Sequence, residues 1–122
     1  MISLNAYKLL HLLGMMMVFV ALGGVAIHAA SGASRQSNPY RSTLGVLHGV
    51  GLLLMLVAGF GLLARLGGSI AGGWLWTKVV IWLLLGAATV LPYKRRGLAS
   101  AMLGLLPLLG MLAAYLAIYK PF

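Results

Sequence analysis

Four long apolar stretches occupy most of this chain, at about residues 7–29, 43–66, 73–91 and 98–118. The hydrocarbon core of a bilayer is about 30 Å thick, so a helix that crosses it needs about 20 mostly apolar residues. Each stretch meets this requirement, and the short connections between them make neighbouring helices antiparallel. We therefore predict an all-α integral membrane protein, a single domain over residues 1–122, folded as an up-down-up-down bundle of four transmembrane helices.

The composition excludes several kinds of chemistry. The chain contains no Asp, Glu or Cys, but it has nine Lys plus Arg and three His. Without carboxylates it cannot form a glycosidase pair, a Ser-His-Asp triad or a side-chain cage for calcium or magnesium. Without cysteine it cannot form thiolate metal sites or attach a c-type haem. The net charge of +9 lies mainly at helix ends, where it suits lipid headgroups, so we expect no nucleic-acid partner.

The Lys and Arg residues also predict an orientation, because cytoplasmic loops carry the excess of positive charge. The connections between the first and second and between the third and fourth stretches hold five cations: Arg35, Arg41, Lys94, Arg95 and Arg96. The opposite side holds Lys8, Arg65 and Lys120, with Lys78 slightly inside the third stretch. This bias places both connections in the cytoplasm and both termini outside. The first stretch, roughly 20 apolar residues long, exceeds the 7–15 residues of a secretory signal, so we expect it to span.

Glycines recur within the predicted spans. Gly45 and Gly49 form a GxxxG pair, and Gly14 and Gly51 are among the other small positions. Small residues let membrane helices approach closely, and they also leave room for a flat cofactor or a partner helix. The segment LHLLG that ends at Gly14 resembles the segment LHGVG that ends at Gly51. In oppositely directed helices this would be an inverted repeat, although chance is the simpler explanation among so few residue types.

Four ionisable side chains fall within the predicted spans: His11, His28, His48 and Lys78. Such residues are costly in a membrane and are usually functional. We expect His11 and Lys78 at similar depth on the side of the termini, and His28 and His48 together on the opposite side. His11 and His28 are 17 positions apart, or roughly 25 Å along a helix. The histidines therefore define two candidate sites.

A neutral imidazole is a good axial ligand for haem iron, and facing helices can hold a haem between them. We interpret His11 and His48 as candidate ligands of a haem iron, and Lys78 and His28 as further cofactor-binding residues. The structural alternatives are that each histidine bonds a backbone carbonyl or lies in the headgroup zone. For Lys78 the alternative is that its side chain extends to the membrane surface.

Two segments resemble a known group of small polytopic membrane proteins. Residues 7–14 (YKLLHLLG), followed by Gly23 and Gly24, resemble the opening helix of HemJ and CopD-like proteins. Residues 74–80 (WLWTKVV) are similar to the HemJ segment that carries a functional lysine. HemJ proteins are haem-containing protoporphyrinogen oxidases in which a first-helix histidine and a third-helix lysine matter. The resemblance implies these roles for His11 and Lys78, and it implies a bacterial inner membrane.

These observations favour a small membrane protein that binds haem b or works with a quinone in electron transport. The propionates of a haem favour Lys or Arg partners, and Lys8 and Arg41 lie near suitable helix ends. Whether the chain is an enzyme is left open, and a bound lipid is a further possibility. The alternative is a non-catalytic accessory subunit, which packs as a homo-oligomer or within a larger respiratory or photosynthetic membrane complex.

Overall fold

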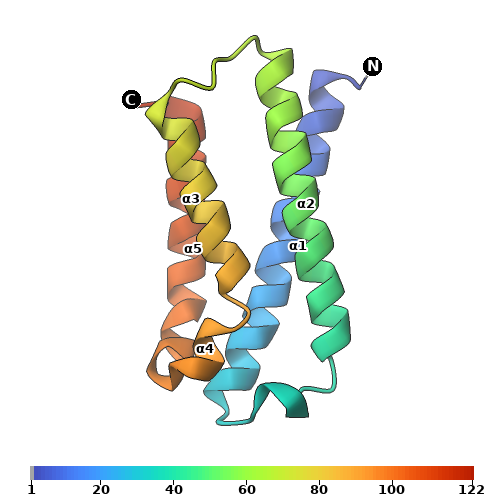
Figure 1. Ribbon diagram of the computed structural model, residues 1–122, viewed down its shortest axis with the longest axis vertical. Coiled ribbons are helices and arrows are strands. Elements are labelled where there is room, and N and C mark those ends of the chain that lie inside the picture. Colours follow the sequence, from blue (N-terminus) through green and yellow to red (C-terminus); the bar gives the residue numbers. More distant parts are fainter. Residues whose placement is uncertain (1) are drawn as a thin grey trace.

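A computed structural model describes residues 2–122 as an all-helical protein. Its four long helices are α1 (Leu4–Ala30), α2 (Arg41–Arg65), α3 (Gly73–Ala87) and α5 (Arg96–Tyr119). Two short elements lie in the connections: the 3-10 helix η1 (Arg35–Ser37) and the single-turn helix α4 (Leu91–Lys94). In Figure 1 the chain passes down α1, up α2, down α3 and up α5. We call the end with both chain ends the termini end, and the end with η1 and α4 the loop end.

Three of these helices are long and apolar enough to cross a membrane. They are α1, α2 and α5, with mean hydropathies of 2.2, 2.3 and 2.1 over their most apolar segments. Helix α3 has only 15 residues, or about 22 Å of helix at 1.5 Å per residue. The helix predicted over residues 73–91 is therefore interrupted after Ala87. The other long helices begin two or three residues before the predicted positions.

The position of Pro92 explains the interruption of the third apolar stretch. Proline has no N–H to donate to the carbonyl of Ala88, and inside a continuous helix its ring would also clash with that carbonyl. The chain accordingly leaves the helix through a turn at residues 88–90. Pro92 then lies in the first turn of α4, where a missing N–H has little cost. A separate short helix, α4, thus begins at Leu91 at the loop end.

Helices α1 and α2 pack most closely at a pair of glycines. A Cβ atom on Gly14 would lie 2.7 Å from the carbonyl oxygen of Gly51, and one on Gly51 would lie 2.8 Å from that of Gly14. The two backbones therefore touch directly. The GxxxG pair does not make this kind of contact, since a Cβ on Gly45 or Gly49 would have no described atom within 4 Å. Gly14 and Gly51 are the last residues of the two similar segments in the sequence.

The apolar core lies where the middle of α1 meets α3 and α5. Its buried members are Val18, Leu22 and Ala26 of α1, Ile81 and Leu85 of α3, Ala88, and Met102, Leu106 and Leu116 of α5. Many other large apolar side chains point outward, and Leu9, Val57 and Ile118 are each more than 60% exposed. An outer surface of this kind suits hydrocarbon rather than water.

The long helices form two pairs, α1 with α2 and α3 with α5 (Figure 1). Helix α1 also packs on α5, and this contact joins the two pairs. Two described hydrogen bonds link α2 to α3. The Trp82 indole N–H donates to the Leu52 carbonyl over 3.0 Å, and His48 Nε2 donates to the Leu85 carbonyl over 2.9 Å. Both bonds lie in the middle or toward the loop end. The two pairs are therefore tied together there and separate toward the termini end.

Candidate cofactor cavity

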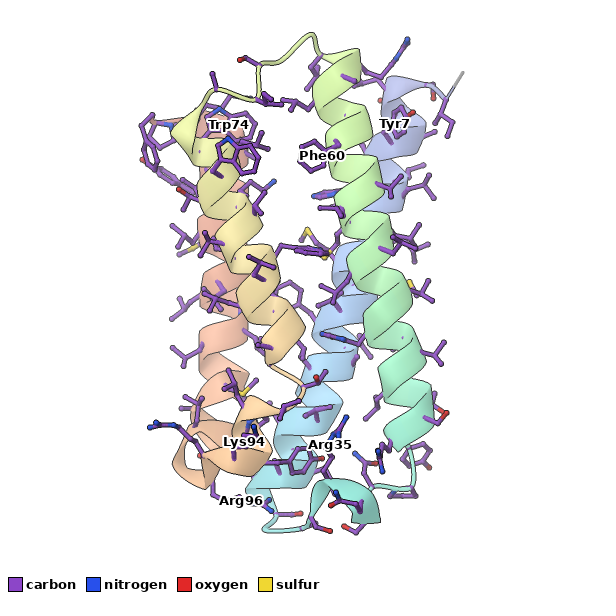
Figure 2. The ribbon with its side chains drawn as sticks, viewed as in Figure 1. Tyr7, Arg35, Phe60, Trp74, Lys94 and Arg96 are labelled. Atoms are coloured by element: carbon purple, nitrogen blue, oxygen red, sulfur yellow. The ribbon has the colours of Figure 1, made fainter. Side chains whose placement is uncertain are left out.

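A cavity of about 890 Å³ lies between the two helix pairs toward the termini end. Its lining is mostly apolar and comes from all four long helices. Figure 2 shows Phe60 of α2 and Trp74 of α3 on opposite sides of this region, and the Trp82 ring also lines the cavity. Cofactor and small-molecule sites typically measure about 300–1,000 Å³. This cavity, which we call the large cavity, therefore has the size of a cofactor site.

Basic side chains and one histidine line the large cavity. They are Lys8 and His11 of α1, Lys78 of α3, and Lys120, which follows α5. The chain has no Asp or Glu, so no acidic side chain of the protein can neutralise these lysines. An anionic ligand is the electrostatic complement of such a cavity.

His11 is held by a backbone carbonyl of the neighbouring helix. Its Nδ1 lies 2.9 Å from the carbonyl oxygen of Met55 on α2. A carbonyl can only accept a hydrogen bond, so Nδ1 carries the proton and Nε2 keeps a free lone pair. Within residues 2–122, Nε2 has no hydrogen-bond partner. Histidines that bind metals commonly donate their second N–H to such an outer acceptor, which fixes the tautomer and the ring orientation.

Gly59 leaves the space that the His11 ring occupies. A Cβ atom at this position would lie 3.2 Å from Cε1 and 3.3 Å from Nδ1 of His11. Both distances are tighter than ordinary carbon contacts of about 3.5–4.0 Å. A larger residue at position 59 would therefore push the imidazole away from its carbonyl acceptor. The sequence alone does not indicate a role for Gly59 at the site, because its importance depends on which α1 side chain faces it.

The structure brings Lys78 to the same cavity as His11, the arrangement that their similar depths predict. The two side chains are close enough to interact electrostatically. In the described part of the chain, the Lys78 ammonium has no hydrogen-bond acceptor. It is half-buried rather than extended fully to the surface. An ammonium in this position needs an acceptor that residues 2–122 do not provide.

Lys120 is a third cation beside the large cavity. Its Nζ donates to the Ala117 carbonyl over 2.9 Å and lies 5.2 Å from the centre of the Trp74 ring. The Trp74 backbone N–H donates to the Phe122 carbonyl over 3.0 Å, which holds this segment against the start of α3. From the sequence, Lys120 was only a helix-end charge. Its predicted location on the same side of the bundle as Lys78 was the one sequence feature that could have indicated a position beside the cavity.

The second predicted site is arranged differently. His48 is 7% exposed and donates from Nε2 to the Leu85 carbonyl near the end of α3. His28 Nδ1 lies 2.7 Å from the Tyr93 hydroxyl. No described hydrogen bond joins the two histidines, but Tyr93, the partner of His28, lines a smaller cavity together with His48. His11 and His48 line different cavities. No cluster of three or more metal-binding His side chains occurs within residues 2–122.

The structure also separates the two residues expected near haem propionates. Lys8 lines the large cavity, whereas Arg41 lines the smaller one at the loop end.

A scan against protein-family models and searches of the curated proteins and of the solved structures found no match to this chain. The resemblance to HemJ and CopD-like proteins therefore stays a prediction.

Proposed function

We propose that this chain is an integral membrane protein that binds haem b in the large cavity, with His11 as its iron ligand. In this proposal all four long helices cross the bilayer in alternating directions, α3 doing so together with α4. The positive charge bias favours a cytoplasmic loop end and a termini end outside. A bacterial inner membrane is the location that the sequence resemblance favours.

The observation that carries the proposal is the environment of His11. A neutral imidazole with a free Nε2 lines an apolar, cofactor-sized cavity, and its Nδ1–H is fixed by the Met55 carbonyl. This is the donor arrangement that haem iron and other metals use in proteins. Among the three histidines, only His11 lines the large cavity.

The charge of the cavity supports haem over a neutral ligand. Haem b carries two propionate groups, and Lys78, Lys8 and Lys120 line the same cavity. Hydrogen bonds between an ammonium and a carboxylate are short and strong. A quinone is uncharged and would leave the Lys78 ammonium without a counter-ion. We therefore assign Lys78 to a propionate and Lys8 and Lys120 to further stabilisation of the same negative charge.

When bound, haem b supplies one-electron redox chemistry at its iron. The protein residues position the group, exclude water through the apolar walls, and balance its charge. No carboxylate can relay a proton in this chain. Proton movement near the cavity therefore falls to His11, to the lysines that line the cavity, and to water.

A fluorescence titration tests the proposal. Trp74 and Trp82 line the large cavity, so haem bound there will quench their emission. The purified chain in detergent is titrated with haemin and, in parallel, with haemin dimethyl ester, whose propionates carry no charge. We expect saturable quenching by haemin, with binding weaker by roughly 10- to 100-fold for the ester or for Lys78→Met, the range for a hydrogen bond to a charged group. Equal binding of haemin and its ester, or no saturation, would contradict the proposal.

The alternative is an accessory subunit of a larger membrane complex. The separation of α2 from α3 toward the termini end favours it, because a helix of a partner protein could occupy the large cavity. The two functions differ in a simple readout. A colourless protein that co-purifies with a large complex, and that does not bind haemin, would establish the accessory role in place of the haem site.

A further inference from the structure

A second, smaller cavity of about 210 Å³ lies at the loop end. It is lined by parts of α1, η1, α2 and the turn that leads into α4. Its polar lining consists of Arg35, Asn38, Arg41, His48, Thr89 and Tyr93. Figure 2 shows Arg35 at this end of the molecule, on the opposite end from Trp74 and Tyr7. We call it the arginine cavity.

The two arginines of this cavity are not used by the fold. Neither Arg35 nor Arg41 has a side-chain hydrogen bond within the described residues. Arg96 behaves differently, since its Nη1 donates to the Ala29 and Ala33 carbonyls and so caps the end of α1. The guanidinium groups of Arg35 and Arg41 therefore remain available, and the chain has no carboxylate side chain to pair with them.

A hydrogen-bonded framework surrounds these arginines. The Asn38 side chain is 9% exposed, accepts from the Tyr40 backbone N–H over 2.9 Å and donates to the Tyr93 hydroxyl over 3.5 Å. The Tyr93 hydroxyl also contacts His28. These bonds fix one wall of the cavity, while the Thr89 hydroxyl has no described partner and lines the same space. Three donor groups thus lack acceptors: two guanidinium groups and one hydroxyl.

We propose that the arginine cavity binds a phosphate group. Arginine forks match the geometry of phosphate oxygens and bind them in a bidentate manner. The volume of about 210 Å³ is below the range of about 300–1,000 Å³ for complete cofactors, but it accommodates one tetrahedral anion and a few waters. The cavity lies at the end of the bundle where the loop cations gather, which is the level of lipid headgroups. This site is separate from the large cavity and does not depend on haem.

The phosphate can come from an anionic lipid or from solution, and the test separates these sources. The purified chain is exchanged into phosphatidylcholine nanodiscs that contain or lack phosphatidylglycerol, and retained lipid is measured by native mass spectrometry. Binding of inorganic phosphate is measured separately by calorimetry in discs without phosphatidylglycerol. We expect Arg35→Gln and Arg41→Gln each to weaken the binding by roughly tenfold or more, as for a charge-assisted hydrogen bond.

Arg95→Gln is the matched control, because it removes the same charge at the same end from a residue that does not line the cavity. Arg41→Lys keeps the charge but removes the fork, so it should weaken binding less than Arg41→Gln. Selective loss of phosphatidylglycerol in the cavity variants supports a headgroup site. The same pattern with inorganic phosphate alone supports a site for free phosphate. Equal loss in Arg95→Gln, or no binding of either probe by the folded wild-type chain, would overturn the proposal.

Discussion

His11 of α1 and Met55 of α2 are joined by a hydrogen bond of 2.9 Å between the imidazole Nδ1 and the backbone carbonyl oxygen. The bond crosses the helix pair that packs through Gly14 and Gly51. It therefore depends on a close backbone contact about one helical turn away. The position of the candidate iron ligand is in this way a consequence of glycine packing.

The carbonyl contacts of His11 and His48 predict the tautomer of each ring. Because the carbonyl of Met55 can only accept, neutral His11 should carry its proton on Nδ1. His48 contacts the Leu85 carbonyl through Nε2 and should carry its proton on that nitrogen. Nitrogen-15 solid-state NMR of the haem-free protein in lipid distinguishes the two forms, with His11→Ala and His48→Ala used for assignment. The same tautomer at both residues would be incompatible with these contacts.

Gly59→Ala should weaken haem binding without unfolding the protein. The added Cβ would lie 3.2 Å from Cε1 of His11, so the ring must shift from its carbonyl acceptor. Changes around a metal-binding histidine commonly cost 10- to 100-fold in affinity, and we expect roughly tenfold. Gly49→Ala is the control on the same helix, because its Cβ would meet no described atom. Equal haemin affinity in the two variants would show that Gly59 has no part in placing His11.

Gly14→Ala should destabilise the fold itself. Its Cβ would lie 2.7 Å from the Gly51 carbonyl oxygen and 2.8 Å from the Met55 backbone nitrogen. Backbone atoms cannot move aside as a flexible side chain can, so we expect a loss of about 1–3 kcal/mol in the free energy of unfolding. Gly45→Ala should have little effect, since the position is open. Unfolding in mixed micelles with increasing SDS measures both, and the reverse order of stabilities would reject this packing.

His48→Ala should reduce stability and leave haem binding intact. The change removes the hydrogen bond from α2 to the end of α3, and hydrogen bonds between membrane helices contribute about 0.6–1.7 kcal/mol. The loss of packing around a buried ring adds to this. Val46→Ala, at an exposed position of α2, is the control for the same SDS unfolding experiment. A His48→Ala protein of wild-type stability with reduced haemin affinity would assign His48 to the ligand site instead.

The sequence predicted the helices well, because a long apolar run has few alternatives in a membrane. It located α1, α2 and α5 to within three residues at each end. The third helix was predicted too long because apolar residues continue past Ala87, and hydropathy does not register the effect of Pro92 on the backbone. Gly45 and Gly49 stood out as a GxxxG pair, and Gly14 and Gly51 were only two among several other small positions, since a GxxxG spacing is visible in one helix. The pair that meets, Gly14 and Gly51, can be recognised only when the register between two helices is known.

The candidate site was predictable in part for the same reason. Depth along a helix can be counted from the sequence, and this places His11 and Lys78 on one level. Rotation about the helix axis cannot be counted so simply. The sequence therefore did not reveal that His48 faces the end of α3, that Arg41 lines another cavity, or that Gly59 makes room for an imidazole.

The visible absorption spectrum of the protein purified from haem-supplied cells tests the central assignment most directly. We predict a Soret band in the wild type that is lost in His11→Ala and retained in His48→Ala and His28→Ala. The far-UV circular dichroism of all three variants should stay helical, so that the loss reports ligation rather than unfolding. A colourless wild-type protein, or a Soret band unchanged in a folded His11→Ala variant, would contradict His11 as the iron ligand.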